Sequence, residues 1–394
     1  MNRKNLVLAA VAAAVCLDTL IYGIIIPILP AYSASLGASP WQIGVIFAAY
    51  SAALLAGTIP LGILSDRYGR KKIMFCGLLS LSLSTIGFAL ANSIMLLVVT
   101  RLMQGLAAAA TWTAGPALVA DLFSPEERGA KMGVLSAANG FGFLVGPAAG
   151  GVLYQWGGYS LPFVLCTVLA VLIGLLVLMV IPGHPSAVGR VANGQSLRQV
   201  LGNRGVLTGS AVILLGSIGF GFIDPLLPGY FTQKFNITPS TIGFLFAVIS
   251  LCHIAAAPLV GRLSDRVGRL KLIRLGLIAT ALAVPLLAPA GNLLLTAAVM
   301  GLLGITFSLL LTPSMPLMAD AVMPTEDNSH DAGYGAAFGI YNTAFSLGYL
   351  IGPLAGGGWL EFFSLPSLLV AYSVFLLLVG LPALTAGSRS LQAD

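Results

Sequence analysis

The chain alternates long apolar runs with short polar connections. Each run has about 20 residues or more, the length of an α-helix that crosses the hydrocarbon core of a bilayer. Because a membrane span must satisfy its own backbone hydrogen bonds, we interpret each run as a transmembrane helix. The pattern predicts about twelve helices, at 6–31, 41–64, 73–91, 94–118, 130–153, 160–182, 206–229, 240–262, 271–290, 292–318, 333–357 and 365–385.

A charged segment occurs twice, half a chain apart. Gly62-Ile-Leu-Ser-Asp-Arg-Tyr-Gly-Arg-Lys-Lys72 returns 199 residues later as Gly261-Arg-Leu-Ser-Asp-Arg-Val-Gly-Arg-Leu-Lys271. Each copy joins two apolar runs, and repetition on this scale is typical of secondary transporters. We therefore predict an all-helical membrane protein of two similar six-helix halves, at 1–182 and 206–394, with a cytoplasmic linker at 183–205.

The composition agrees with a chain that lies in lipid. Charged residues make up 8% of the sequence and hydrophobic residues 58%, and the mean hydropathy is +0.97. Soluble proteins carry about 25% charged residues. So few charges cannot cover the surface of a water-soluble fold, which excludes the soluble classes.

The net charge of +6 does not indicate a nucleic-acid partner, because the charges are spread over many connections. Seventeen of the nineteen Lys and Arg residues fall at the chain ends, in alternate connections or within the span ends that adjoin those connections, and the exceptions are Arg101 and Lys234. Lys and Arg accumulate in cytoplasmic loops. We expect a multi-pass protein of the cell inner (plasma) membrane with both termini in the cytoplasm, and an uncleaved first helix.

Familiar catalytic and metal-binding motifs are absent from the sequence. It has no GxxxxGK[ST] loop for a nucleotide and no HExxH pair. Cys16, Cys76, Cys166 and Cys252 lie far apart in predicted spans and lack metal-ligand spacing, so we interpret them as packing residues. We predict neither an enzyme nor a cofactor.

The first candidate for chemistry is Asp18, near the middle of the first predicted span. A carboxylate at that depth is costly unless it faces a cavity, pairs with another group or is protonated. We interpret Asp18 as a site that binds a proton or a cation in exchange, with Tyr22 as a neighbour on the same helix face. The alternative is a neutral Asp that hydrogen-bonds only for packing.

Asp224 is the second acidic residue within a predicted span. The segment Asp224-Pro-Leu-Leu-Pro228 corresponds to Ile26-Pro-Ile-Leu-Pro30 in the first half, so both helices carry a proline pair near one end. Proline pairs interrupt helical hydrogen bonding and allow bending. We expect Asp224 to bind substrate or protons, unless it is an interfacial residue in a water-filled vestibule.

Arg101 and His253 are further polar residues within spans. Arg101 should face the protein interior and meet a carboxylate, a carbonyl or water, because an unpaired Arg is too costly in lipid. It is a candidate for proton transfer or for shaping the field around Asp18, with a structural role as the alternative. Histidine titrates near neutral pH, so His253 could shuttle protons, unless it is a neutral packing residue. Candidates to line a cavity are Tyr50, Gln104, Trp112, Asn139, Tyr341 and Asn342.

Each copy of the charged segment combines residues that suit a gate. An Asp ends a helix, an Arg follows it, a Gly permits the turn and a second Arg comes next. Such groups can pair in one conformation and separate in another, and Asp121 is the expected partner of Arg70. The alternative is a loop whose charge only sets topology. The predicted gating residues are Asp66, Arg67, Gly69, Arg70, Asp121, Asp265, Arg266 and Arg269.

A glycine-rich run marks the fifth predicted span. Gly142, Gly146 and Pro147 recur in the second half as Gly348, Gly352 and Pro353. Glycines at four-residue spacing let two helices approach closely. Close packing is expected in any case, and whether a kink here also seals a leak stays open.

Together these motifs resemble the major facilitator superfamily over nearly the whole chain. Residues 62–72 and 261–271 are similar to its loop signature and the second copy of that signature, and residues 97–105 are similar to its arginine motif. Residues 142–151 resemble a motif associated with antiporters. The resemblance implies twelve helices with a cavity between two halves.

Within the superfamily the chain is similar to the twelve-helix drug:proton antiporters, especially to bacterial relatives of the vesicular monoamine transporters. In that branch an Asp in the first helix binds the substrate amine and an acidic residue before the seventh-helix Pro assists. The resemblance implies these roles for Asp18 and Asp224. The chain departs from the branch at Tyr50 and Asn342, where the vesicular proteins have Lys and Asp. The runs that carry the similarity are 17–20, 26–30, 127–133, 224–228 and 334–345.

The sequence therefore predicts a proton-coupled antiporter that exports lipophilic or cationic small molecules, of multidrug or monoamine type, by alternating access. We expect a monomer whose partners are a small substrate, protons and the lipid bilayer, and no nucleic acid. The alternatives are a proton-coupled nutrient symporter and a non-transporting membrane receptor or scaffold. Asp18 in mid-membrane and the two charged turns favour transport, and the glycine-rich run favours antiport.

Overall fold

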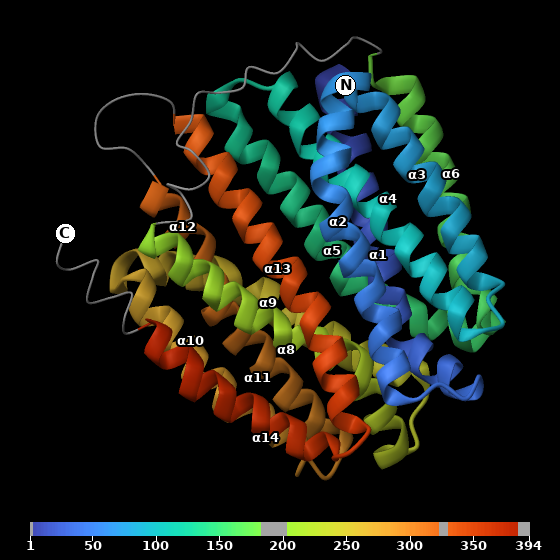
Figure 1. Cartoon of the computed structure of the whole chain (residues 1–394), viewed down its shortest axis with the longest axis vertical. Helices are drawn as coiled ribbons and strands as arrows, with labels where there is room; N and C mark the ends of the chain where they lie inside the picture. The colour runs from blue at the N-terminus through green and yellow to red at the C-terminus, as the bar shows by residue number, and fades with distance from the viewer. Residues whose placement is uncertain (1–2, 183–202, 323–329, 385–394) are drawn as a thin grey trace. The chain divides into compact units, whose positions relative to one another are not determined.

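The computed structural model describes residues 3–182, 203–322 and 330–384, and within these ranges every regular element is helical (Figure 1). Eleven candidate spans in these ranges are long and apolar enough to cross a membrane. The helix α13 (His330–Leu360), 31 residues long, contains the remaining predicted span. The predicted all-helical, twelve-span membrane fold is confirmed.

The chain divides into two compact units. The first comprises Met1–Arg190 and Asp224–Ala247, and the second comprises Val191–Ile223 and Val248–Asp394. Six helices of the first unit are α1 (Arg3–Ser35), α2 (Pro40–Tyr68), α3 (Arg70–Ala89), α4 (Ile94–Leu122), α5 (Pro125–Gly157) and α6 (Ser160–Val180). Two further helices, α8 (Arg204–Phe235) and α9 (Pro239–Val267), contribute to both units.

Local signals explain where the helices of the first unit begin and end. Ser39 and Gln42 form a capping box at the start of α2, with backbone-to-side-chain hydrogen bonds of 2.9 and 3.4 Å. Gly69 separates α2 from α3 with a φ of 97°, which a residue without Cβ adopts at little cost. In the second copy of the charged segment Gly268 takes the same conformation, with a φ of 100°.

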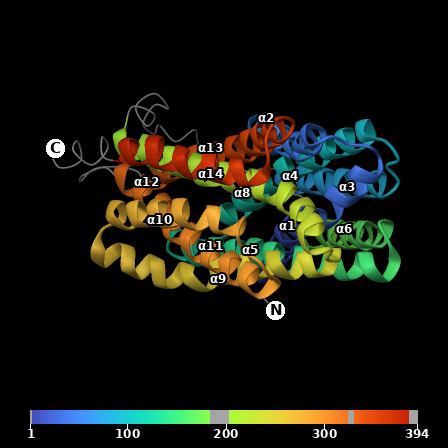
Figure 2. The same ribbon diagram turned by 90° about the horizontal axis from the view of Figure 1, so that it is seen from below.

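The first unit packs its helices in neighbouring pairs. Helix α1 contacts α5, α2 contacts α4, and α3 contacts both α4 and α6. Helices α3 and α6 lie side by side in both ribbon views (Figure 2). The arrangement brings residues from α1, α2 and α4 together inside the unit.

The second unit shows three departures from uninterrupted spans. The predicted span 271–290 is α10 (Arg269–Ala283) followed by a 3-10 turn, η1 (Val284–Leu287), which contains Pro285. The predicted span 292–318 is divided at Pro313 into α11 (Leu293–Leu311) and α12 (Ser314–Val322). The last predicted span begins as α14 (Leu365–Phe375) and continues as a π-helix, η2 (Leu376–Gly380).

Glycines bring equivalent helix pairs into close contact in both halves of the sequence. A methyl group added at Gly146 of α5 would lie 2.8 Å from the Leu20 carbonyl oxygen of α1. One added at Gly352 of α13 would lie 2.5 Å from the Ile218 carbonyl oxygen of α8. The internal repeat seen in the sequence therefore extends to backbone packing.

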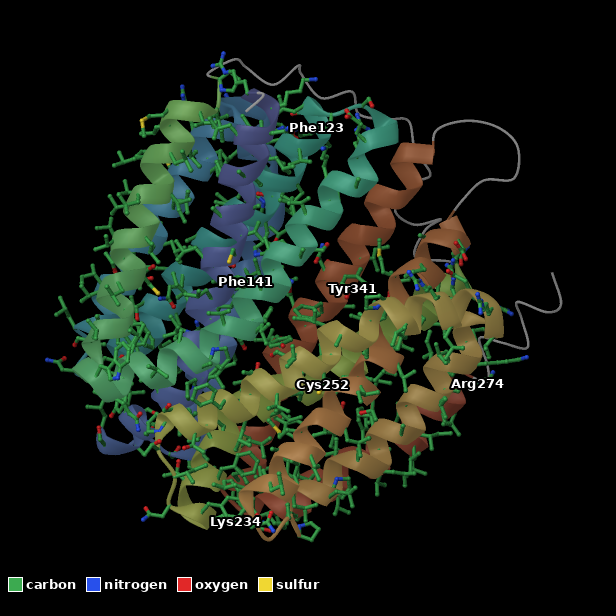
Figure 3. The ribbon with its side chains drawn as sticks, turned by 180° about the vertical axis from the view of Figure 1, so that it is seen from behind. Phe123, Phe141, Lys234, Cys252, Arg274 and Tyr341 are labelled. Atoms are coloured by element: carbon green, nitrogen blue, oxygen red, sulfur yellow. The ribbon has the colours of Figure 1, made fainter. Side chains whose placement is uncertain are left out.

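Apolar side chains cover the outer faces of many helices. Leu83 in α3, Met179 in α6 and Leu282 in α10 are 58%, 74% and 64% exposed. Most of the sticks that project from the ribbon carry only carbon (Figure 3). In water such a surface would be unfavourable, whereas in hydrocarbon it meets a solvent of its own polarity.

Candidate functional site

Asp18 lies inside the first unit, near the middle of α1, and is 1% exposed. The hydroxyl of Tyr50 in α2 donates a hydrogen bond to Asp18 Oδ2 over 3.0 Å. The indole N–H of Trp112 in α4 donates to the same oxygen over 2.9 Å. Asp18 Oδ1 is buried and has no hydrogen-bond partner among the described residues. Two helices thus supply donors to one oxygen and leave the other open.

Arg101 is 0% exposed and lies among aromatic rings. Its guanidinium carbon is 4.7 Å from the ring centre of Tyr50, 5.2 Å from Tyr22 and 5.5 Å from Phe47. Cations within about 6 Å of a ring face are attracted by its quadrupole. Aromatic faces therefore supply much of the environment of Arg101, where a carboxylate, a carbonyl or water was predicted from the sequence.

A short series of side-chain hydrogen bonds holds one side of the Arg101 guanidinium. Arg101 Nη1 donates to Gln104 Oε1 over 3.3 Å, and Gln104 Nε2 donates to Thr85 Oγ1 of α3 over 3.2 Å. The Nε and Nη2 atoms of Arg101 are buried without a hydrogen-bond partner in the described part of the chain. Arg101 also interacts electrostatically with Asp18, so the two groups form one site with opposite charges. We call Asp18, Tyr22, Tyr50, Arg101 and Trp112 the Asp18 cluster.

The contact between α1 and α5 places Asn139 beside this cluster. Thr19, next to Asp18, hydrogen-bonds through its hydroxyl to the Asn139 carbonyl over 3.3 Å as well as to the Val15 carbonyl over 3.1 Å. The side-chain oxygen of Asn139 is buried and has no partner within the described ranges. A methyl group added at Gly142 would lie 2.6 Å from the Cys16 carbonyl oxygen, so α5 can approach Asp18 only because Gly142 is small.

The second repeat has the same backbone scaffold without these polar groups. A methyl group added at Gly105 of α4 would collide with the Tyr50 carbonyl of α2, and one at Gly304 of α11 would collide with the Ile249 carbonyl of α9. The offset is 199 residues for both positions (304 − 105 and 249 − 50). At that offset Arg101 corresponds to Met300. The polar cluster is therefore a property of the first half.

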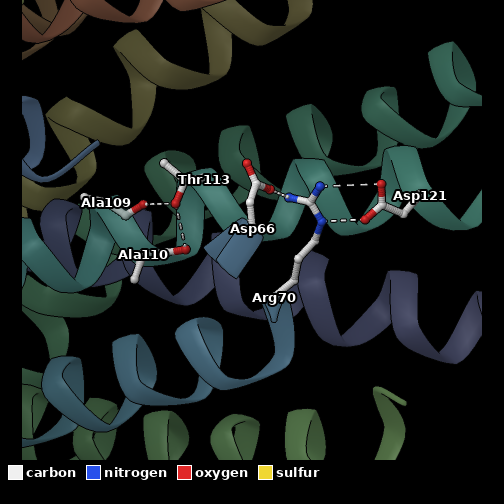
Figure 4. Close-up of polar contacts among 6 residues, drawn as sticks. All are labelled: Asp66, Arg70, Ala109, Ala110, Thr113 and Asp121. Carbon is white, nitrogen blue, oxygen red and sulfur yellow. Dashed lines mark hydrogen bonds and ion pairs between the residues drawn. The ribbon is translucent and has the colours of Figure 1, made fainter. Parts of the chain in front are cut away.

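The first charged turn forms the ion pairs expected of it. Arg70 lies between two carboxylates, with its Nε 2.5 Å from Asp121 and its Nη1 3.3 Å from Asp66 (Figure 4). The predicted contact between Arg70 and Asp121 is present, and it joins the start of α3 to the end of α4. Arg67 is exposed and lies over the ring of Tyr68 at 5.4 Å.

The second charged turn repeats this arrangement. Arg269 pairs with Asp265 at 3.9 Å and, more closely, with Asp320 in α12. Asp320 stands 199 residues after Asp121, the offset that relates the two copies of the turn (320 − 121). Asp320 is not among the gating residues predicted from the sequence, although this offset could have identified it. Arg266 is exposed, like Arg67.

Three of the predicted site residues lie in helices that contribute no residue to the Asp18 cluster. Asp224 is 5% exposed in α8, directly before Pro225. His253 lies in α9 with its Nδ1 buried and without a hydrogen-bond partner in the described residues, and its ring meets Phe220 edge-on at 6.3 Å. Asn342 is half-buried in α13. The structure thus groups Tyr22, Arg101 and Trp112 with Asp18, and a side-chain hydrogen bond between Tyr22 and Asp224 joins Asp224 to this cluster. The roles of Asp224, His253 and Asn342 stay predictions.

Comparison with known proteins decides the family. The model of the Major Facilitator Superfamily matches residues 11–223 and 209–390. The chain belongs to the Major Facilitator Superfamily.

Among curated proteins of the superfamily the chain is similar to vesicular transporters. It is 28% identical to the synaptic vesicular amine transporter of Mus musculus and 30% identical to the chromaffin granule amine transporter of Rattus norvegicus, over 84% of its own length in each case. It covers 64% and 62% of those proteins, which is less than two thirds of their length. It is also 28% identical to a probable vesicular acetylcholine transporter of Danio rerio, with 90% of this chain and 74% of that protein covered.

Solved structures of proteins with lower sequence identity have the same fold. A bacterial homologue of the human lysosomal transporter Spinster superposes with a TM-score of 0.81 at 15% identity, covering 100% of this chain and 98% of that one. A nucleoside transporter gives 0.75 at 13% identity, with 96% and 99% covered. At these identities the likeness concerns the fold alone.

Proposed function

We propose that this protein is a proton-coupled antiporter that exports lipophilic or cationic small molecules through alternating access. The observation that carries the proposal is Asp18, a carboxylate in mid-helix with aromatic neighbours and one oxygen that accepts no hydrogen bond from the described residues. A buried carboxylate of this kind can be neutralised either by a proton or by a cationic ligand. The similarity to transporters named for amines supports a cationic substrate.

Exchange at one carboxylate couples the two fluxes. When Asp18 holds a proton it offers no charge to a cation, and when it holds a cation it offers no site to a proton. A ligand shifts a conformational balance only through its different affinity for the two states. A proton that moves inward down a potential of ~100 mV releases ~2.3 kcal/mol, which is available to drive substrate outward.

The charged turns support the alternating-access part of the proposal. Arg70 and Arg269 each join a turn to the end of a later helix, through Asp121 and Asp320. These pairs are partly exposed, so each is worth only about 0–1 kcal/mol. Weak pairs of this kind can break and form during transport without a large energetic cost. We propose that both turns are gates on the cytoplasmic side.

The location of the protein is part of the proposal. The distribution of Lys and Arg favours a plasma membrane location with both termini and both charged turns in the cytoplasm. In that orientation substrate leaves the cell as protons enter it. We propose a monomer as the functional unit, because each internal half repeats the other within one chain.

Inside-out membrane vesicles that contain the protein test the function directly. An imposed proton gradient, acidic inside, should drive uptake of monoamines or lipophilic cationic dyes, and adding such a compound should dissipate the gradient. Asp18→Asn should abolish both effects while expression stays near normal, because it removes a titratable charge and little volume. Asp18→Glu should be partly active. Uptake of a neutral nutrient in the same direction as protons would instead identify a symporter.

A further inference from the structure

The two oxygens of Asp18 have different surroundings. A carboxylate oxygen has two lone pairs and can accept about two hydrogen bonds. Asp18 Oδ2 accepts two, from Tyr50 at 3.0 Å and from Trp112 at 2.9 Å. Asp18 Oδ1 is buried and accepts none from the described residues. The acceptor capacity of Oδ2 is therefore used, and that of Oδ1 is unused.

The donors on Oδ2 come from helices that pack closely against each other in the first unit. Tyr50 is 8% exposed, and its ring contacts the Arg101 guanidinium at 4.7 Å and the Tyr22 ring at 5.4 Å. Trp112 extends from α4, the helix that carries Arg101. The packing of α2 against α4 thus holds both donors in place. Turning the carboxylate to exchange its oxygens would break both hydrogen bonds.

We infer that Asp18 Oδ1 is the single oxygen at which proton and cation are exchanged, and that Tyr50 and Trp112 are positioning residues that hold Oδ2. The inference rests on the proposed function and specifies its chemistry. In the protonated state the O–H bond is on Oδ1, and Oδ2 is the carbonyl oxygen. On exchange that O–H bond breaks, its proton passes to water, and an N–H of the cation donates to Oδ1.

This geometry also selects among cations. A guanidinium binds a carboxylate best through two parallel N–H···O bonds, one to each oxygen. Because Oδ2 already accepts two hydrogen bonds, a guanidinium can bind only to Oδ1 and loses its second bond. An ammonium needs only one oxygen. The site should therefore favour amines over guanidines or amidines of the same size.

Infrared spectroscopy of the purified protein tests the assignment without any ligand. The acid C=O stretch of Asp18 is identified as the band that forms on acidification and is missing in Asp18→Asn. If Oδ2 is the carbonyl oxygen, its two hydrogen bonds lower the frequency of this band. Tyr50→Phe and Trp112→Phe should then each raise it. Tyr372→Phe, which removes a buried hydroxyl donating to the Leu215 carbonyl over 2.9 Å in the second unit, should leave it unchanged.

The outcomes separate this inference from the proposed function. A band at the frequency of a free acid that neither Tyr50→Phe nor Trp112→Phe moves would place the proton on Oδ2 and overturn the inference alone. Absence of any acid band that depends on Asp18 would overturn proton exchange at this residue, and the inference with it. Because each variant removes one donor only, one well-folded variant suffices to observe the shift.

A matched pair of ligands tests the selectivity. Phenethylamine and phenethylguanidine share the same apolar part and differ in the cationic group. Phenethylamine should displace the Asp18 acid band at a lower concentration than phenethylguanidine in the wild type. Tyr50→Phe should shift the ratio toward the guanidine by up to about tenfold, the value of roughly one hydrogen bond to a charged group. A wild-type preference for the guanidine would overturn the single-oxygen assignment.

Discussion

At the scale of single residues, Arg101 has the least usual environment in the first unit. Its side chain is fully buried, and two of its three guanidinium nitrogens have no hydrogen-bond partner in the described part of the chain. Burying an ion costs several kcal/mol. Contacts with aromatic faces return about 2 kcal/mol when desolvated. Arg101 therefore does not stabilise the fold strongly, and its presence requires a functional explanation.

We predict that Arg101→Met leaves folding intact and impairs coupling. The second repeat has Met300 at the equivalent position, so methionine fits this helix packing. Replacing a whole buried ion pair with apolar side chains is often neutral or stabilising by about 1–4 kcal/mol, whereas removing one partner is costly only if the other keeps its charge. In Arg101→Met we expect Asp18 to take up a proton, which leaves no uncompensated charge. The midpoint of thermal unfolding in detergent should stay level or rise, while proton-driven uptake falls strongly. Arg101→Lys should retain part of the activity.

A different result would identify a structural role. If Arg101→Met lowered the unfolding midpoint and lost activity only in proportion to the folded fraction, Arg101 would act through packing and hydrogen bonding. Gln104→Leu is the matched control, because it removes the hydrogen bond at 3.3 Å and keeps the charge. In that variant we expect a smaller loss of coupling than in Arg101→Met.

All five members of the Asp18 cluster were named as candidates from the sequence, but its geometry was not predicted. Asp18 and Arg101 stood out because charged residues are rare in spans. The contact of Arg101 with Phe47 could not be predicted, because a phenylalanine in an apolar run carries no local signal. It also could not be predicted that one Asp18 oxygen, Oδ2, accepts both hydrogen bonds, because this depends on how α2 and α4 are rotated toward α1.

At the scale of helices, the contact between α1 and α5 depends on glycine. Gly142→Ala would place a methyl group 2.6 Å from the Cys16 carbonyl oxygen and 3.0 Å from the Leu20 amide nitrogen, both backbone atoms of α1. We predict a loss of about 1–3 kcal/mol in unfolding free energy, the usual cost of overpacking. Circular dichroism during thermal unfolding would measure it.

Gly133→Ala is the matched control in the same helix. Nothing lies within 4 Å of a methyl group added there. Alanine is favoured over glycine inside a helix by about 1 kcal/mol, so this variant should be at least as stable as the wild type. Equal destabilisation by Gly133→Ala and Gly142→Ala would contradict the close contact.

The charged turn that joins α2 to α3 leads to a kinetic prediction. Arg70→Ala and Asp66→Asn should slow transport by up to about tenfold, equivalent to 1.4 kcal/mol, and leave substrate affinity nearly unchanged. The reason is that the pairs with Asp66 and Asp121 link helix ends and do not include Asp18. Turnover and binding affinity should be measured separately in proteoliposomes.

Two further variants make this test specific to the ion pair. Lys72→Ala removes an exposed cation from the same region and should have little effect. The double variant Arg70→Asp/Asp121→Arg exchanges the two charges. It should recover part of the turnover that each single change loses. A selective loss of substrate affinity in Arg70→Ala, with normal turnover, would contradict the gating role.

Helix ends and breaks show what the hydrophobic pattern can predict. The pattern located all the spans but ended them at the edge of the apolar run, whereas α5 begins at Pro125 and ends at Gly157, beyond the predicted 130–153. Helices continue into polar segments because their backbone hydrogen bonds do not require lipid. The break at Pro313 was missed because helices α1 and α8 continue through their own prolines, so proline alone does not indicate an interruption.

At the scale of the molecule, the two halves share a scaffold and differ in chemistry. The charged turns and the glycine contacts recur in both, while the cluster around Asp18 has apolar counterparts such as Met300. Duplication of the scaffold suits a transporter that rocks between two states. The buried Asp18 and Arg101 lie in helices of the first half, and the second half adds the buried Asp224 of α8. We therefore propose that both halves take part in the motion and that the site around Asp18 carries most of the coupling.

The exchange model predicts that a bound cation displaces a proton. At low pH a proton occupies Asp18 and a cation must compete with it, so cation affinity should fall as pH decreases and level off at high pH. Calorimetry of a monoamine or a lipophilic phosphonium ion, in buffers of different ionisation enthalpy, would count the protons released. Binding that releases no proton and does not vary with pH would rule out exchange. Release that persists in Asp18→Asn but disappears in Asp224→Asn would instead assign the coupling to α8, because only one of the two carboxylates can then be the site where proton and cation compete.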